Sequence, residues 1–215
     1  MTASRLADPL RPVRPERPDA RRGRSGWITG LLALAIAVAG SANAAEIEDI
    51  PFPDQANAGD AELPLFGLGL LRYKVLFRGY VGGLYLPEGV PASRTLDDVP
   101  KVLELYYFWD IDAPLFGEAA DDLLARNHPP ERIAALRSRL DRLHGLYRDV
   151  EEGDRYRLTY VPGDGMSLHH NDDFLGKIPG ADFASDYFGI WLGDAPLNEA
   201  FRDQMFERFG VAERP

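Results

Sequence analysis

Two histidines and three polar residues stand side by side in the stretch SLHHNDDFLGKIPG. Imidazole and carboxylate groups are ligands that hold zinc, iron or manganese in proteins. Neighbouring side chains of a strand point to opposite faces, so His169 and His170 cannot both chelate one ion simply. Asn171, Asp172 and Asp173 suit a hairpin tip, because Asn and Asp tolerate left-handed backbone conformations. The pattern therefore predicts a turn between two short strands, and we expect no metal site and no cofactor.

Other familiar catalytic signatures are missing from the sequence. The 215 residues include no cysteine, which excludes disulfides, thiolate chemistry and Cys-based metal or haem attachment. His128 and His144 fit no zinc-binding spacing. We find no Ser-His-Asp arrangement and no GxxxxGK[ST] phosphate loop. The sequence therefore shows none of these catalytic or metal-binding signatures.

The first 44 residues differ in composition from the rest of the chain. Seven arginines precede the uncharged apolar run GWITGLLALAIAVAG, and an Ala-Asn-Ala sequence ends at Ala44. A positive region, a short apolar region and an Ala-x-Ala site define a secretory signal peptide, so we expect residues 1–44 to be cleaved after Ala44 and the protein to be periplasmic. An uncleaved membrane anchor is the alternative, and the Arg21-Arg22 pair raises the twin-arginine route.

Removal of this leader would leave a mature chain of formal charge −14, against −10 for the whole sequence. A protein this acidic is repelled by the phosphate backbone of nucleic acids and by anionic membrane surfaces. We therefore expect no nucleic-acid partner, and no integral membrane span in the mature form. The net charge does not indicate whether the protein is a monomer or an oligomer.

Strand signals dominate the first part of the mature chain. Residues 45–62, rich in Pro, Asp and Ala, are expected to be an extended segment leading into one domain at 63–210, with a tail at 211–215. The stretch LLRYKVLFRGYVGGLYL is dense in Val, Leu, Phe and Tyr. Gly79, Gly82 and Gly83 indicate bulges, or the close approach of another backbone or of a ligand. KVLELYYFWD, residues 101–110, is another aromatic-rich strand.

Helices are predicted in the middle and at the end of the domain. Asp112 is the expected N-cap of one helix, and an apolar stripe at three- and four-residue spacing in HPPERIAALRSRLDRLHGLYRDV indicates another. Tyr187 and Trp191 share a face of a third helix, in which Trp191 is expected to anchor the helix to the sheet, and Asp194 is the expected cap of a fourth. Strands separated by hairpins lie between the helical regions. This order favours an α+β fold with an antiparallel sheet.

Two ordered motifs resemble those of bacterial chalcone isomerase-like proteins. YRLTYVPGDGMSLHHNDDFLGKIPGADFASDYFGIWLGDAPL contains Pro-Gly-x-Gly between two strands, an Asn-containing turn, Gly-x-Ile-x-Gly and a helix ending in Trp-Leu-Gly. LFGLGLLRYKVLFRGYVGGLYLPEG contains a Gly-x-Gly segment with an arginine, followed by Tyr-x-x-x-Leu-Tyr-Leu. The resemblance covers most of residues 63–210 and implies membership of the superfamily of chalcone isomerases and fatty-acid-binding proteins.

The resemblance implies an open-faced β-sandwich, in which helices cover one face of a large antiparallel sheet. A cleft between the sheet and the helices is then expected to hold an elongated amphipathic ligand. Plant chalcone isomerases close a flavanone ring there, with an arginine and a tyrosine steadying an enolate. Related plastid proteins use similar residues to hold a fatty-acid carboxylate without catalysis. Many bacterial relatives are exported and have no assigned reaction.

Carried over by motif, the arginine of the family is Arg72 and the polar position on the next strand is Tyr80. Their separation of eight is even, so an uninterrupted strand would place both side chains on one face. A guanidinium binds a carboxylate or enolate through forked donors, and a phenol adds one more. Tyr106 and Tyr107 are the nearest matches to the family's catalytic tyrosine. Arg72 and Tyr80 are the expected catalytic residues of an enzyme, and all four are the expected ligand-binding residues.

Three functions follow from these observations. The first is an exported binder of a small amphipathic anion, such as a fatty acid or a planar phenolic. The second is an isomerase of the intramolecular-lyase type, in which Arg72 and a tyrosine stabilise an enolate. The third is an envelope protein that binds a partner and whose cleft is vestigial. The sequence departs from the plant enzymes at Tyr80, where they have threonine, and in an extra residue before Arg72.

Overall fold

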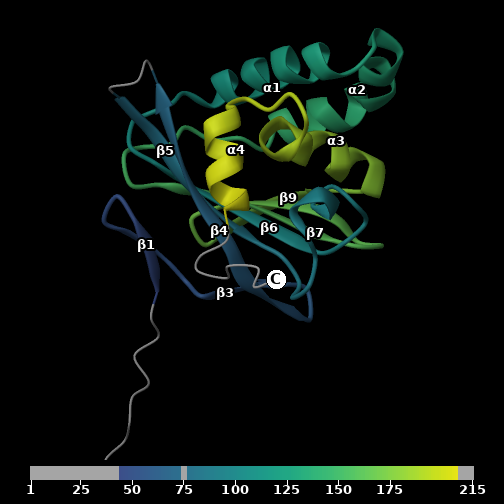
Figure 1. Ribbon diagram of the computed structural model, residues 1–215. Coiled ribbons are helices and arrows are strands. Elements are labelled where there is room, and N and C mark those ends of the chain that lie inside the picture. Colours follow the sequence, from purple (N-terminus) through teal and green to yellow (C-terminus); the bar gives the residue numbers. More distant parts are fainter. Residues whose placement is uncertain (1–43, 74–76, 208–215) are drawn as a thin grey trace, which may run out of the picture. The chain divides into compact units, whose positions relative to one another are not determined.

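The computed structural model describes residues 44–73 and 77–207, which form the part of the chain discussed below (Figure 1). All but the last residue of the predicted signal peptide, and the predicted tail, lie outside the described residues. Within them, no helix has the length and apolar character needed to cross a membrane.

Seven antiparallel strands form the main sheet, in which the strands lie side by side in chain order from β3 to β9. The strands are β3 (Gln55–Ala58), β4 (Ala61–Tyr73), β5 (Phe77–Tyr85), β6 (Lys101–Tyr107), β7 (Arg155–Val161), β8 (Gly165–His170) and β9 (Asp173–Ile178). A separate hairpin is formed by β1 (Ala45–Ile47) and β2 (Ile50–Phe52). The segment expected to lead into the domain thus supplies this hairpin, strand β3 and the start of β4.

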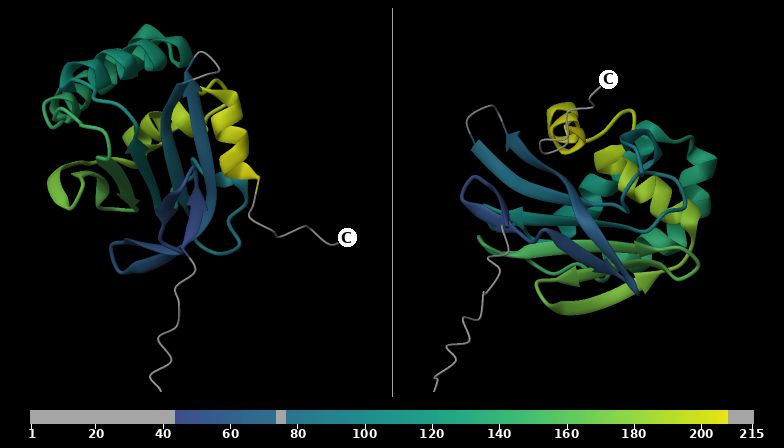
Figure 2. Two further views of the ribbon diagram at one scale, coloured as in Figure 1. Left: turned by 90° about the vertical axis from the view of Figure 1, so that its left-hand side faces the viewer. Right: turned by 60° about the horizontal axis from the view of Figure 1, so that its bottom comes forward.

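Helices lie on one face of the sheet, as the two views of Figure 2 also show. They are the short 3-10 helix η1 (Ala92–Arg94), α1 (Ala113–Asn127), α2 (Pro130–His144), α3 (Ala181–Leu192) and α4 (Glu199–Phe206). The other face carries a smaller apolar cluster centred on Phe52 of β2. The α+β fold expected from the sequence, with a large antiparallel sheet covered on one face by helices, is confirmed.

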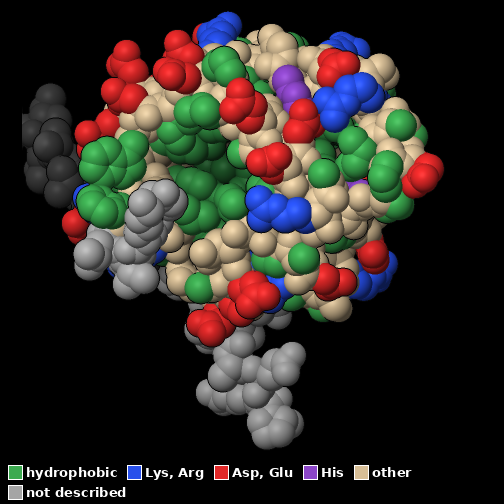
Figure 3. Space-filling model, turned by 90° about the horizontal axis from the view of Figure 1, so that it is seen from above, with side chains coloured by type: hydrophobic (Ala, Val, Ile, Leu, Met, Phe, Trp, Pro, Cys, Tyr) green, Lys and Arg blue, Asp and Glu red, His purple; other side chains and the backbone are tan. Residues whose placement is uncertain are grey.

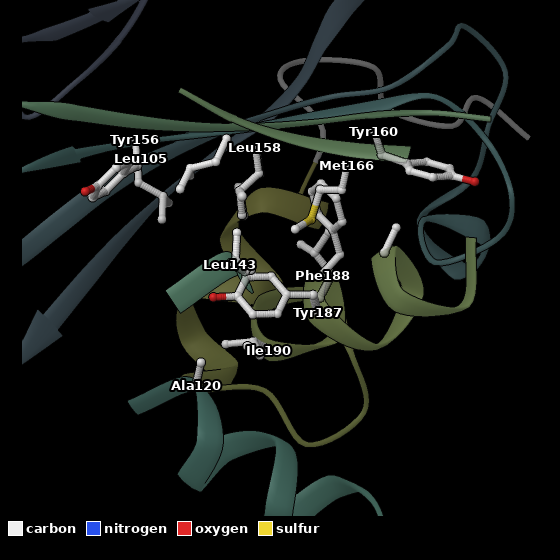
Figure 4. Packing of buried hydrophobic residues seen from close by; sticks show 14 of the residues in the cluster. Leu105, Ala120, Leu143, Tyr156, Leu158, Tyr160, Met166, Tyr187, Phe188 and Ile190 are labelled. Carbon is white, nitrogen blue, oxygen red and sulfur yellow. The ribbon is translucent and has the colours of Figure 1, made fainter. Parts of the chain in front are cut away.

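The main core lies between the sheet and the helices. Figure 4 shows Leu158 of β7 and Met166 of β8 pointing from the sheet toward Tyr187 and Phe188 of α3. All four side chains are almost completely buried. The apolar stripe predicted for α2 packs into the same cluster, with Leu136 among its buried residues. Burial on this scale explains how an antiparallel sheet and four helices hold together without disulfides.

Helix α4 lies directly against β4 because two glycines leave room for it. A Cβ atom added at Gly67 would stand 1.9 Å from the carbonyl oxygen of Met205, and one at Gly69 would stand 2.7 Å from that of Phe201. The sequence had predicted bulges or close approaches at Gly79, Gly82 and Gly83 instead. The bulge is present at Gly79, whereas Gly82 and Gly83 lie against the side chains of Phe201 and Phe52. The predicted cap of this helix at Asp194 is wrong, because Asn198 is the N-cap and accepts a hydrogen bond from Phe201 N at 2.8 Å.

The predicted N-cap of α1 is confirmed at Asp112. The predicted turn between β8 and β9 is also present, with Asn171 in a left-handed conformation at φ 52°. His170 lies 3.1 Å from a carboxylate oxygen of Asp154, whereas His169 contacts the ring of Phe174. The described residues contain no cluster of three or more His, Asp or Glu that could hold a metal ion.

The segment carrying Arg72 and Tyr80 is not one strand. Strand β4 ends at Tyr73, β5 begins at Phe77, and the two pair as a hairpin in which Leu71 is opposite Tyr80 and Arg72 is opposite Arg78. The register shift between these two pairs skips Gly79. Arg72 therefore faces away from Tyr80, because the uninterrupted strand that would place both on one face is not present.

Candidate functional site

An apolar cavity of about 260 Å³ lies between the sheet and the helices. Its walls come from β5, β6, β7 and β8 on the sheet side and from α1 and α3 on the helix side. Seen from above, the surface is hollowed by a pit with hydrophobic walls, and acidic side chains stand along part of its margin (Figure 3). A concave, largely apolar pocket with a few polar groups is the usual form of a small-molecule site.

Five tyrosines supply almost all the polar atoms of the cavity wall, and no residue with a charged side chain lines it among the described part of the chain. They are Tyr80, Tyr107, Tyr147, Tyr156 and Tyr187. The ring of Tyr156 packs edge to face against Tyr107, Tyr147 and Phe116. Tyr107 packs edge to face against Phe116 at 5.6 Å, whereas Tyr147 stacks on it. Such contacts fix the rings without consuming their hydroxyl groups.

Tyr80 and Tyr107 stand opposite each other on neighbouring strands, with ring centroids 5.6 Å apart. The indole Nε1 of Trp191 donates a hydrogen bond to the Tyr80 hydroxyl oxygen at 3.0 Å. This bond joins α3 to β5, which confirms that Trp191 anchors its helix to the sheet. Trp191 also lines the cavity.

The remaining tyrosine hydroxyls differ in how well they are paired. Tyr156 donates to the carbonyl oxygen of Arg148 at 2.7 Å and accepts from its backbone nitrogen at 2.8 Å. Tyr147 and Tyr187 bond each other at 2.5 Å. The hydroxyl of Tyr107 makes no hydrogen bond with any described residue. The cavity therefore holds at least one phenol that is free to meet a ligand.

Burial keeps these phenols protonated. Desolvation raises the pKa of Tyr80, with the Trp191 hydrogen bond partly opposing it, and raises the pKa of Tyr147. The pKa values of Tyr107 and Tyr187 are raised further, by desolvation first and by neighbouring phenols second. A buried phenol that stays neutral acts as a hydrogen-bond donor at every physiological pH.

Part of the cavity rim is apolar. Leu115 is 50% exposed and Leu197 42% exposed, and both line the cavity, as does the exposed Ala119. A shallow depression lined by Phe77, Arg78 and Trp109, among others, adjoins the cavity at Tyr80 and Ile111, which line both. Four large exposed apolar side chains, Phe77, Trp109, Leu115 and Leu197, thus lie where a ligand would enter, whereas Phe174 lies at another hollow.

Arg72 does not line this cavity. Its side chain is 49% exposed, and its Nη2 lies 3.0 Å from Oε1 of Glu48 in the turn between β1 and β2. Arg78, its partner across the hairpin, lies 3.6 Å from the same carboxylate and stacks over the ring of Phe108. Both arginines belong to the sheet face opposite the helices. The structure does not bring Arg72 together with Tyr80.

The other two candidates separate in the same way. Tyr107 faces the helices and the cavity, whereas Tyr106 faces outward against Phe108 and beneath the guanidinium of Arg155. Of the four residues expected from the sequence, Tyr80 and Tyr107 therefore meet at the cavity, and Arg72 and Tyr106 lie on the opposite face of the sheet.

That outer face carries a second, polar hollow of about 450 Å³. Its charged groups are engaged with one another, since the carboxylate of Glu104 forms an ion pair with Arg155 and lies 4.0 Å from Arg157. Lys177 forms an ion pair with Asp164. These internal pairs leave the apolar cavity as the better candidate for a ligand site.

Several residues of the cavity wall could not be assigned to a site from the sequence. Phe116, Tyr156 and Tyr187 follow the periodic patterns of helix and strand, which predict burial but not a cavity, and Tyr147 lies in the segment after α2. The one available signal was the number of tyrosines at positions predicted to be buried, because each brings a hydroxyl group that needs a hydrogen-bond partner.

Comparison with known proteins agrees with the fold. A solved structure of a fatty-acid binding protein from Arabidopsis thaliana superposes with a TM-score of 0.57 at 17% sequence identity, covering 74% of this chain and 92% of that one. No curated protein sequence matches. The family model for chalcone isomerase-like proteins matches residues 44–207. Because that match spans most of the sequence, the chain belongs to the chalcone isomerase-like family.

Proposed function

We propose that this protein is exported and binds a small, largely apolar molecule, such as a lipid chain or a planar phenolic, in the cavity between sheet and helices. The observation that carries the proposal is the cavity itself, whose wall is apolar and aromatic apart from phenolic hydroxyls. Such a wall favours apolar ligands, since transfer of apolar surface from water is the main source of binding free energy.

Two further observations support a binding role. The Arabidopsis protein of similar fold is described as a fatty-acid binding protein. The rim residues Leu115 and Leu197 are exposed although they are large and apolar, and exposed apolar groups around a pocket are typical of ligand entry sites. The export part of the proposal rests on the arginine-rich and apolar leader that ends at Ala44.

The experiment is to purify the protein from the periplasm, denature it and identify released small molecules by mass spectrometry. A single apolar species, at close to one molecule per chain, is the expected result. An empty extract, together with no rise in melting temperature on addition of lipids or phenolics, would count against binding and favour a partner-binding protein with a vestigial cleft. A leader that remains attached, or a protein recovered only from the cytoplasm, would count against export.

An isomerase of the intramolecular-lyase type is the second candidate, and the paired phenols favour it. Neutral phenol donors in a water-poor site can stabilise an enolate as it forms. The described cavity wall offers no arginine for this purpose. Incubation with 2′-hydroxychalcone tests the candidate, because an enzyme would give an excess of one flavanone enantiomer. A racemic product formed at the spontaneous rate would rule out the isomerase function.

A further inference from the structure

The polar hollow of about 450 Å³ on the sheet face opposite the helices shares no lining residue with the apolar cavity. One side of it is formed by outward-facing residues of β5 to β9, and the other by the segment 53–59, which includes β3. Strand β3 pairs only with β4, yet the turn after it reaches β7, because a Cβ atom added at Gly59 would lie 3.4 Å from Val161. The segment thus folds toward the sheet and forms a wall of the hollow.

Two buried polar atoms that line this hollow have no hydrogen-bond partner among the described residues. Tyr85 is completely buried, and its hydroxyl group is unpaired. Nδ1 of His169 is also buried and unpaired. Buried polar groups of proteins are nearly always hydrogen-bonded, and leaving one without a partner is unfavourable. Two such atoms in one hollow therefore point to a partner from outside the chain.

The charges of the hollow leave one cation without a hydrogen-bonded counter-ion. The carboxylate of Glu104 forms an ion pair with Arg155, and Lys177 forms one with Asp164. The guanidinium of Arg157 lies 4.0 Å from Glu104, which is too long for a hydrogen bond, and no described residue accepts a hydrogen bond from it. Its side chain is 34% exposed, so a ligand from solvent can reach its donors. A ligand that brings a negative charge would complete the pairing.

The side chains of His169 and Tyr85 both lie within electrostatic range of Arg157. Arg157 is directly opposite His169 on the neighbouring strand β8, and the Cβ atoms of such pairs are about 4.5–5.5 Å apart. Desolvation, and then the charge of Arg157, lower the pKa of His169, so its imidazole is neutral at pH 7. Burial first, and then the charge of Glu104, raise the pKa of Tyr85. Both unpaired groups are therefore neutral hydrogen-bonding groups near a free guanidinium.

We propose that the polar hollow is a second binding site, for a small hydrophilic carboxylate such as a hydroxy acid. The carboxylate group of the ligand binds the guanidinium of Arg157, and its hydroxyl groups pair with Tyr85 and His169. A guanidinium holds a carboxylate through two parallel N–H donors. Hydroxyl groups both donate and accept, so they suit a phenol and either tautomer of a neutral imidazole. Thr159 and Ser167, which also line the hollow, favour the same polar class of ligand.

The test is titration calorimetry on the purified protein with gluconate and with glucitol, in about 0.15 M sodium chloride to screen non-specific charge effects. The two probes share a chain of hydroxyl groups, and only gluconate has a carboxylate. We expect gluconate to bind at least about tenfold more tightly than glucitol, because a hydrogen bond to a charged group is stronger than a neutral one. Equal affinities, or no binding of gluconate at millimolar concentration, would overturn the proposal.

Removal of the guanidinium tests the anchor of the ligand. Arg157→Gln should weaken gluconate at least about tenfold and change glucitol binding little. Its melting temperature should change little, because Arg157 makes no hydrogen bond with any described residue. Arg72→Gln is the matched control, since it removes the same charge from the same sheet face outside the hollow, and it should not change the affinity. An unchanged affinity in Arg157→Gln, or an equal loss in both variants, would contradict the assignment of Arg157.

A second pair of variants tests the unpaired phenol. Tyr85→Phe removes a hydroxyl group without a partner, so it should not lower the melting temperature and should weaken gluconate about 2- to 10-fold. Tyr106→Phe, on the same sheet face but outside the hollow, should not change the affinity. A gluconate affinity unaffected by Tyr85→Phe would overturn the role of this hydroxyl. None of these outcomes bears on the apolar cavity, because the two sites lie on opposite faces of the sheet.

Discussion

The guanidinium of Arg72 lies 3.0 Å from the carboxylate of Glu48, on the sheet face opposite the helices. Glu48 sits in the turn between β1 and β2, which packs with Phe52 on that face, and Arg78 shares the same carboxylate at 3.6 Å. The arginine that sequence comparison assigns to the ligand site is thus occupied elsewhere, and the cavity depends on tyrosines.

Replacement of Arg72 tests this relationship. Arg72→Ala should leave ligand retention unchanged and lower the free energy of unfolding by no more than about 1 kcal/mol, because a half-exposed ion pair contributes little. Retention is measured by mass spectrometry of the released ligand, and stability by urea denaturation. Loss of the ligand from a folded Arg72→Ala protein would mean that the arginine reaches the site after all.

Obstruction of the cavity rim should abolish binding without unfolding the protein. Ala119 is an exposed residue of α1 that lines the cavity, so Ala119→Trp places a large ring at the entrance at little packing cost. Glu118→Trp is the matched control, since Glu118 is exposed on the same helix but does not line the cavity. Ligand affinity, followed by calorimetry, should fall at least tenfold in the first variant only. Equal affinities in both variants would place the site elsewhere.

The contact of α4 with β4 should be sensitive to one methyl group. In Gly67→Ala the new Cβ would overlap the carbonyl oxygen of Met205, so the helix must move, at a cost of about 1–3 kcal/mol in unfolding free energy. Gly189 in α3 has nothing within 4 Å of its Cβ position, and Gly189→Ala should be neutral or stabilising by about 0.5–1 kcal/mol. Chemical denaturation measures both. Similar losses in the two variants would show that steric overlap is not the cause.

The stability of the protein should rise in alkaline solution because of one buried lysine. Desolvation lowers the pKa of Lys101 to about 8, with Asp98 and Asp97 partly opposing it. Between pH 8 and the unfolded value of 10.5, the unfolded chain binds more protons at this site than the folded chain, so the free energy of unfolding increases with pH by up to about 3 kcal/mol.

Denaturation curves from pH 7 to pH 10 on the native protein and on Lys101→Met measure this linkage. The variant should lack the alkaline rise, and the difference between the two curves isolates the lysine from other titrating groups. Parallel curves would mean that the ammonium group is not desolvated in the folded state. The lysine Nζ donates to the carbonyl oxygen of Asp97 at 2.8 Å, which explains how it is accommodated.

The sequence predicted the elements better than it predicted the site. Alternation of apolar and polar residues indicates a half-buried strand, and apolar residues at three- and four-residue spacing indicate a helix. These patterns predicted β7, α2 and the order of strands and helices. The hairpin between β4 and β5 could not be predicted, because no tight-turn sequence marks it. The register shift at Gly79 then places the side chains of Arg72 and Tyr80 on opposite faces of the sheet. A one-residue change in register moves every following side chain to the other face.

The cavity could be predicted only in part. Tyr80 and Tyr107 were identified by motif and strand position, and they do line it. Tyr147 and Tyr187 come from distant parts of the chain and meet through the packing of α3 against the segment after α2. Nothing in a single sequence encodes that a space remains between them, since a void depends on the fit of all its neighbours.

The central claim is that an apolar molecule occupies the space between the sheet and the helices. Its most direct test is a solution NMR titration with methyl decanoate, in which methyl groups of leucine and isoleucine are labelled. The account predicts shifts at cavity residues such as Leu105, Leu158 and Ile190, and none at Leu70 on the opposite face. Shifts confined to Leu70 and its neighbours, or no shifts at saturating ligand, would contradict it.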